Sequence, residues 1–153
     1  MTSNTESKDE ACYQTLDKNK MKTLKYFFLV VDVTVIIYWT ITAFHLIPAE
    51  YLYNDYKNPM LVNWNWSFFP LDILIPITGL YSVYLDKKRN PKWIPYAFTS
   101  LILTSVSGLQ AISYWFLARD FELSWWLPNL FLLIYPFYFL NNLVGKLGQK
   151  NKH

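Results

Sequence analysis

Four long apolar runs restrict the folds that are open to this chain of 153 residues. Each run holds about 20 residues or more, the length that an α-helix needs to cross about 30 Å of hydrocarbon. Charged residues make up only 16% of the chain, whereas soluble domains average about 25%. The pattern predicts an all-α integral membrane four-helix bundle with short loops, whose spans are Leu24–Ile47, Asn65–Leu85, Trp93–Leu117 and Trp125–Val144.

Basic residues are distributed unequally between the connections. Twelve of the 14 Lys and Arg residues fall at the N-terminal end up to Lys25, in the connection at residues 86–92, or in the C-terminal tail. The positive-inside rule then predicts that both termini are cytoplasmic. The net charge of +3 is therefore read as an orientation signal and as contact with the lipid bilayer, and no nucleic-acid partner is expected.

The same pattern divides the chain into three parts. Residues 1–22 are polar and predict a cytoplasmic tail, residues 23–145 the four-span bundle, and residues 146–153 a basic cytoplasmic tail. A soluble fold would need four consecutive buried helices in a small domain, which excludes it. A signal peptide is excluded because the first apolar run is too long and lacks a small-residue cleavage site.

The chain is poor in the side chains that hold metals and cofactors. Cys12 is the sole cysteine, and His45 and His153 are the two histidines. A disulfide framework, a Cys/His metal cluster and bis-histidine haem ligation are therefore not expected, and no metal or cofactor is predicted. No phosphate-binding glycine loop or nucleophile motif identifies a reaction either.

A carboxylate inside the second span is the strongest functional signal. Asp72 costs about 2.5–3.5 kcal/mol in hydrocarbon on insertion scales, so a functional role is the default hypothesis. At 100° per residue, Asn65, Asp72, Pro76 and Gly79 share a sector of about 60°. Pro76 has no N–H, so the Asp72 carbonyl loses its helical partner and stands as a second acceptor near the carboxylate. A protonated or hydrogen-bonded Asp72 with a structural role is the alternative.

Two further titratable residues lie in the first span, on opposite helix faces. His45 continues a polar stripe with Thr34, Tyr38 and Thr42, and Asp32 faces the other way. His45 is expected near the outer interface, as an anchor or a ligand-binding group. Asp32 is expected to make a buried hydrogen bond to another helix, with a proton-coupling role as the alternative.

Several polar groups are assigned to the outer half of the bundle. A polar cluster with an aromatic rim fits the description of a pocket for a lipophilic small molecule. The small residues of the third span, such as Ser100, Thr104, Ser107 and Gly108, are assigned to helix packing. The candidate ligand-binding residues are Asp72, His45, Asn65, Gln110 and Asn129.

The chain resembles the YvaD-like family of bacterial four-helix membrane proteins. The resemblance covers about Lys22 to Val144, and it implies a four-span fold in a bacterial cell membrane without implying an activity. The motifs that carry it are His45-Leu-Ile-Pro48, Glu50-Tyr-Leu-Tyr53, Asn58-Pro59, Asn65-Trp-Ser-Phe-Phe-Pro-Leu-Asp72, Ser107-Gly-Leu-Gln110 and Trp125-Trp-Leu-Pro-Asn129.

A looser likeness links the chain to the EXPERA proteins, which include sterol isomerases and sigma-2-type receptors. Asp32, Asn58-Pro59 and Asp72 stand where that family has acids and an Asn/Asp-Pro pair. Three functions therefore compete: a ligand-binding membrane protein, an isomerase acting on an apolar substrate, and a small proton-coupled transporter that uses Asp32 and Asp72. A homo-oligomer is expected for the transporter.

Overall fold

The computed structural model describes residues 3–48 and 57–150, with side chains described for 22–48 and 57–144. Within these ranges every regular element is a helix, which confirms the all-α prediction. The helices are α1 (Ser3–Ala43), α2 (Pro59–Ser67), α3 (Phe69–Lys87), α4 (Trp93–Ala118) and α5 (Leu123–Lys150). The polar residues 3–22, expected to form a tail, continue α1 toward the N-terminus, and the basic residues up to Lys150 continue α5.

The four predicted apolar runs are confirmed as four helical stretches long and apolar enough to cross a membrane. They cover Lys22–Ala43, Pro59–Lys87, Trp93–Ala118 and Leu123–Val144. Large apolar side chains such as Leu117, Ile134 and Phe137 are exposed on their outward faces. Outward apolar faces of this kind are expected of helices that contact lipid.

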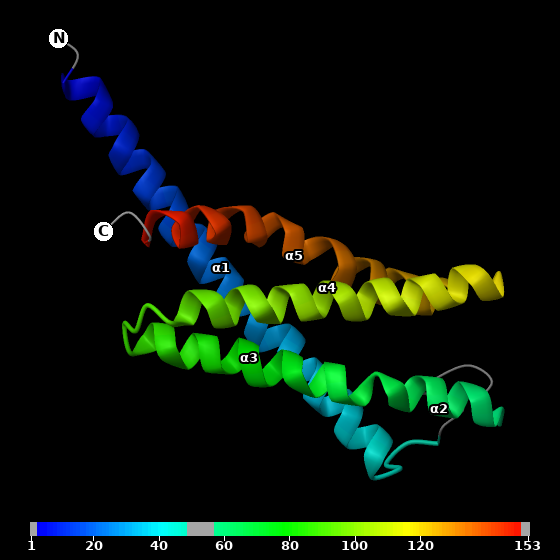
Figure 1. Cartoon of the computed structure of the whole chain (residues 1–153). Coiled ribbons are helices and arrows are strands. Elements are labelled where there is room, and N and C mark those ends of the chain that lie inside the picture. Colours follow the sequence, from blue (N-terminus) through cyan, green and yellow to red (C-terminus); the bar gives the residue numbers. More distant parts are fainter. Residues whose placement is uncertain (1–2, 49–56, 151–153) are drawn as a thin grey trace.

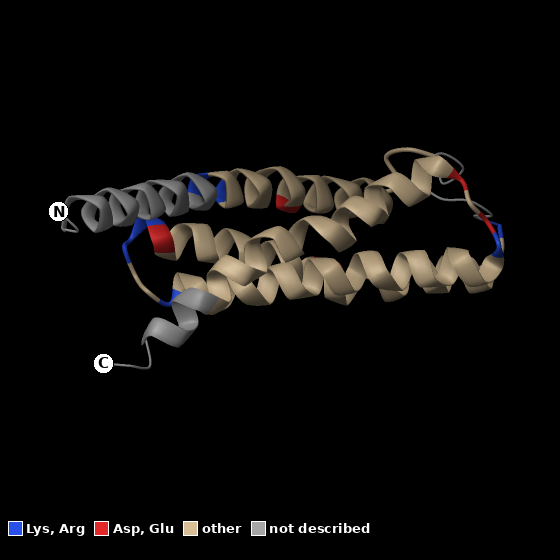
Figure 2. Cartoon of the chain, turned by 90° about the horizontal axis from the view of Figure 1, so that it is seen from above, with Lys and Arg blue, Asp and Glu red and all other residues tan. Residues whose placement is uncertain are grey.

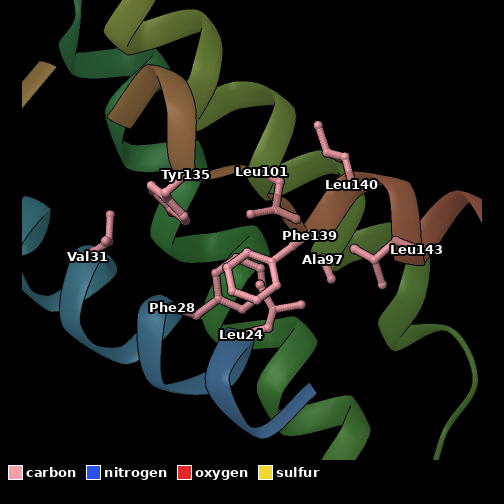
Figure 3. Close-up of a cluster of buried hydrophobic side chains, with 9 residues drawn as sticks. All are labelled: Leu24, Phe28, Val31, Ala97, Leu101, Tyr135, Phe139, Leu140 and Leu143. Atoms are coloured by element: carbon pink, nitrogen blue, oxygen red, sulfur yellow. The ribbon is translucent and has the colours of Figure 1, made fainter. Parts of the chain in front are cut away.

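The helices form a bundle in which α4 packs along both α3 and α5, and α1 crosses α3 obliquely (Figure 1). Both termini and the α3–α4 connection lie at one end of the bundle, called here the termini end. Near that end, side chains from α1, α4 and α5 converge on one hydrophobic cluster (Figure 3). The ring of Phe27 adds to this cluster by packing 5.2 Å from Tyr135 and 5.5 Å from Phe139, between ring centroids.

The second predicted span begins earlier than expected and is broken in the middle. Asn58 caps α2, because its side chain accepts a hydrogen bond from the Met60 amide at 3.0 Å, and Pro59 occupies the first helical turn. The break falls at Phe68, because Pro70 has no N–H to continue the ladder. The Phe68 amide instead bonds the Asn65 carbonyl, three residues back, at 3.2 Å. As a result Asp72 lies near the middle of the 29-residue stretch Pro59–Lys87.

Three helices end on a residue with left-handed backbone that is not glycine. His45, Arg89 and Arg119 have φ of 52°, 54° and 56°. In each case the following amide bonds a carbonyl five residues back, as in a Schellman motif, for example Asp120 N to Trp115 O at 3.1 Å. The first span therefore ends at Ala43 and not at Ile47, and His45 lies in the turn after it.

Candidate functional site

The Asp72 carboxylate connects three helices through hydrogen bonds. The indole Nε1 of Trp39 in α1 donates to Oδ2 at 3.0 Å, and the hydroxyl of Ser107 in α4 donates to Oδ1 at 2.7 Å. An ionised carboxylate offers about four lone-pair positions. Asp72 therefore keeps acceptor capacity beyond these two bonds, and it is better stabilised than a carboxylate alone in hydrocarbon.

Local structure explains why these groups meet. Asp72 lies in the first turn of α3, directly after the break at Phe68, and its own amide donates to the Phe68 carbonyl at 2.8 Å. Trp39 is only 2% exposed, and its ring packs against those of Trp66 and Phe69, with centroids 5.5 and 5.1 Å away. A buried indole N–H needs an acceptor, and the carboxylate is the group it reaches.

A second polar contact joins α1 to α2, at a residue seven positions before Asp72. The Tyr38 hydroxyl donates to Oδ1 of Asn65 at 3.0 Å. Asn65 is 5% exposed, and its Nδ2 has no hydrogen-bond partner. Asn65 therefore brings an unused donor into the interior, on the helix face that it was predicted to share with Asp72.

These groups line a cavity of about 510 Å³ inside the bundle, within the usual range of small-molecule pockets. Its walls are mainly apolar and aromatic, and Asp72, Asn65, Ser107 and Thr104 are among its polar groups. The lining residues come from all five helices. They include Val30, Thr34, Tyr38, Trp39, Trp64, Asn65, Phe68, Asp72, Ile75, Thr104, Ser107, Trp125, Pro128, Asn129 and Phe131.

The cavity lies where α1 separates from α5. The two helices contact each other sparsely, and their ring contacts gather around Phe27, near the termini end. Farther from that end, Val30 and Thr34 of α1 and Pro128 and Phe131 of α5 line the cavity and are exposed. The cavity therefore opens between α1 and α5, on the side of the bundle; this opening is called here the lateral gap.

The structure brings three of the five predicted binding residues to this cavity and leaves two outside. Asp72, Asn65 and Asn129 line it. The Asn129 amide is partly used within its own helix, because Nδ2 donates to the Trp125 carbonyl at 2.8 Å. His45 and Gln110 are exposed and do not line the cavity. For His45 the reason is the end of α1 at Ala43; Gln110 points away on the outer face of α4.

Asp32 occupies a different place, sealed from the cavity. It is 0% exposed, and neither carboxylate oxygen has a hydrogen-bond partner. The expected hydrogen bond to another helix is therefore absent. Asp32 instead packs against Gly79, which lies seven residues after Asp72 in α3, or about 10 Å farther along the axis.

Some residues of the site escaped the sequence reasoning. Trp39, Tyr38 and Ser107 hold the two polar contacts, but Tyr38 was predicted only as part of a polar stripe, Ser107 was assigned to packing, and Trp39 was not assigned to a site. One signal was available for Trp39, because it lies seven residues after Asp32 and so on the same inward face. Within the described residues, no three His, Cys, Asp or Glu side chains come together to hold a metal ion.

Comparison with known proteins places the chain in a family without assigning an activity. Residues 24–150 match a family described as a family of unknown function, DUF5360. The chain is 48% identical over 132 residues to the uncharacterised protein YvaD of Bacillus subtilis (strain 168), covering 86% of this chain and 98% of that protein. No solved structure matches it. The chain therefore belongs to the DUF5360 family.

Proposed function

We propose that the chain spans the bacterial cell membrane four times with both termini in the cytoplasm. The four apolar helices support the spans. Figure 2 supports the orientation, since Lys and Arg gather at the termini end, where Lys22, Lys25, Lys87, Lys88, Arg89 and Lys92 lie. The other end carries Lys57 and Arg119 beside the acids Asp120 and Glu122, and a cytoplasmic surplus of basic residues sets topology.

The single cysteine allows a direct test of this orientation. In intact cells stripped of their wall, a membrane-impermeant maleimide is expected to leave Cys12 unlabelled, and to label it after the membrane is opened. In a Cys12→Ser background, Ala118→Cys, which lies at the opposite end of α4, is expected to be labelled without opening. Labelling of Cys12 in sealed cells would place the N-terminus outside the cell and contradict the proposed topology.

We further propose that the cavity binds a lipophilic molecule with an ammonium head, which reaches it from the bilayer. One observation carries this proposal: a 510 Å³ cavity combines apolar walls with the Asp72 carboxylate. A cation beside Asp72 would neutralise a charge that is costly in hydrocarbon. The rings of Trp39 and Phe68, which also line the cavity, would add cation–π and apolar contact.

The lateral gap between α1 and α5 supports access from the lipid. An alkyl chain would lie along Val30 and Phe131 at the rim, and the head would reach Asp72 inside. The unused Nδ2 donor of Asn65 would suit an oxygen on the same ligand. The pocket thus favours an amphiphile over a fully apolar molecule.

Replacement Asp72→Asn is expected to weaken binding of a brominated long-chain alkylamine about thirtyfold or more, because losing one partner of a buried charge pair costs about 2–5 kcal/mol. Trp39, Trp64 and Trp125 line the cavity, so a bromine on the alkyl chain should quench tryptophan fluorescence saturably. The measurement is this saturable quenching in purified protein, titrated with the amine.

Two controls make the result specific. Asp120→Asn removes an equal charge outside the cavity and should bind the amine as the wild type does. A brominated alcohol of the same chain length should bind the wild type more weakly than the amine does. To Asp72→Asn, the alcohol and the amine should bind with equal affinity. Equal amine affinity in the wild type and Asp72→Asn would reject the site. Conversion of a bound substrate to a product would favour the isomerase alternative over simple binding.

A further inference from the structure

Asp32 is a buried acid that the proposed pocket does not use. It is 0% exposed, both of its oxygens lack hydrogen-bond partners, and it does not line the cavity. Its neighbours come from three other helices. A Cβ atom on Gly79 in α3 would overlap Asp32 Oδ2 and would lie 2.9 Å from Ser100 Oγ in α4. Tyr135 in α5 lies close enough to Asp32 to interact with it electrostatically, and it also lies beside Thr104.

None of these neighbours can balance a negative charge. On α3 the facing residue is Gly79, on α4 Ser100, and on α5 Tyr135, whose buried hydroxyl lies beside Thr104. Tyr135 is the titratable group among them. The structure records no Lys, Arg or His partner for Asp32 in the part of the chain that it describes. A buried carboxylate without a counter-charge or hydrogen bonds would neutralise itself by taking up a proton.

We propose that Asp32 is a proton-binding site, occupied at neutral pH, beneath the floor of the cavity. Close packing favours a proton over a metal ion. Oδ2 lies so near the α3 backbone that Gly79 leaves no space for one carbon atom, and a bound sodium ion would also need several oxygen ligands around it. A proton adds no volume. The protonated carboxyl would be a donor. Ser100 Oγ, which itself donates to the Ile75 carbonyl at 3.2 Å, lies beside the same Cβ position of Gly79.

Two hydroxyl groups, those of Thr104 and Ser100, lie in the region between this site and the cavity. Thr104 and Ile75 line the cavity. The Thr104 hydroxyl donates to the Ser100 carbonyl at 2.8 Å, and Ser100 Oγ donates to the Ile75 carbonyl. Both hydroxyls donate to main-chain carbonyls and neither bonds Asp32, so proton uptake by the carboxylate, to give a neutral acid, is proposed without a hydrogen-bonded path from the cavity.

Infrared spectroscopy of the full-length protein, produced with carboxyl-labelled aspartate, tests this proposal without any ligand. At neutral pH the wild type is expected to show the carbonyl stretch of a protonated aspartic acid, shifted by the label and by deuterium exchange. The band should persist in Asp72→Asn, and it should be lost in Asp32→Asn. Since Asp32→Asn could fail to fold, Asp32→Glu serves as a second variant, because it keeps an acid but removes the label.

Each other outcome overturns the proposal. Absence of the band from the wild type would mean that Asp32 is ionised. Persistence of the band in both Asp32 variants, or its loss in Asp72→Asn, would assign the proton elsewhere. Loss of the band on adding sodium chloride at constant pH, with no loss in choline chloride, would identify a sodium site instead. Because no ligand is used, failure here leaves the alkylamine result at Asp72 unaffected.

Discussion

Replacement Gly108→Ala is expected to destabilise the bundle by about 3 kcal/mol, at the upper end of the cost of overpacking. A Cβ on Gly108 would lie 2.7 Å from the Asn129 carbonyl oxygen and 2.7 Å from the Leu133 amide nitrogen. Both are main-chain atoms of α5, so no side-chain rotation can make room, and α4 and α5 must separate. The nearby bond from Ser105 Oγ to the Leu133 carbonyl, 3.0 Å long, should be strained by the same shift. Denaturant or thermal unfolding in detergent, followed by tryptophan fluorescence, measures the loss.

The sign of this effect distinguishes the close contact from simple helix propensity. In an exposed helix, Gly→Ala stabilises by about 1 kcal/mol. The matched control is Ser113→Thr, which adds one methyl group on the exposed face of α4 and should change stability by less than about 0.5 kcal/mol. If Gly108→Ala were neutral or stabilising, the close approach of α4 and α5 at this residue would be refuted.

Helix number was predictable from the sequence because it depends on the length of apolar runs. The third span, expected at Trp93–Leu117, matches α4 to within one residue at its end. The helix of the second predicted span starts earlier than expected. The prediction began at Asn65-Trp66 and did not treat Asn58-Pro59 as a helix start. The first span ended early because a left-handed residue, His45, terminated the helix without a glycine or an adjacent proline to signal it.

The faces of single helical stretches were predictable, but the contacts between helices were not. Rotation by 100° per residue placed Asn65 and Asp72 on a common face, and both line the cavity. The partners Trp39 and Ser107 depend on how far each helix slides along its neighbours, and periodicity contains no such information. His45 and Gln110 were grouped with Asp72 by depth alone. Depth leaves the direction of a side chain open, and both of these residues are exposed.

Replacement Gly79→Ala is expected to destabilise the wild type by about 2 kcal/mol, and to cost less than about 0.5 kcal/mol in an Asp32→Ala background. The new Cβ would overlap the Asp32 carboxylate, which neighbours from three other helices hold in place; without that carboxylate only the Ser100 hydroxyl lies close, and a hydroxyl can rotate away. A double-mutant cycle measured by unfolding in detergent gives the coupling, expected at about 2 kcal/mol.

Ser100 provides the control for this cycle, because its hydroxyl lies 2.9 Å from the same Cβ position. Gly79→Ala should remain costly in a Ser100→Ala background, and an equal cost in the wild-type and Asp32→Ala backgrounds would reject the predicted contact. Asp32→Ala alone should be close to neutral, because removal of an unpartnered buried polar group regains about 1–3 kcal/mol, which offsets the lost packing. An acid that adds nothing to stability, and that requires a glycine opposite it, is better explained by proton binding than by a structural role.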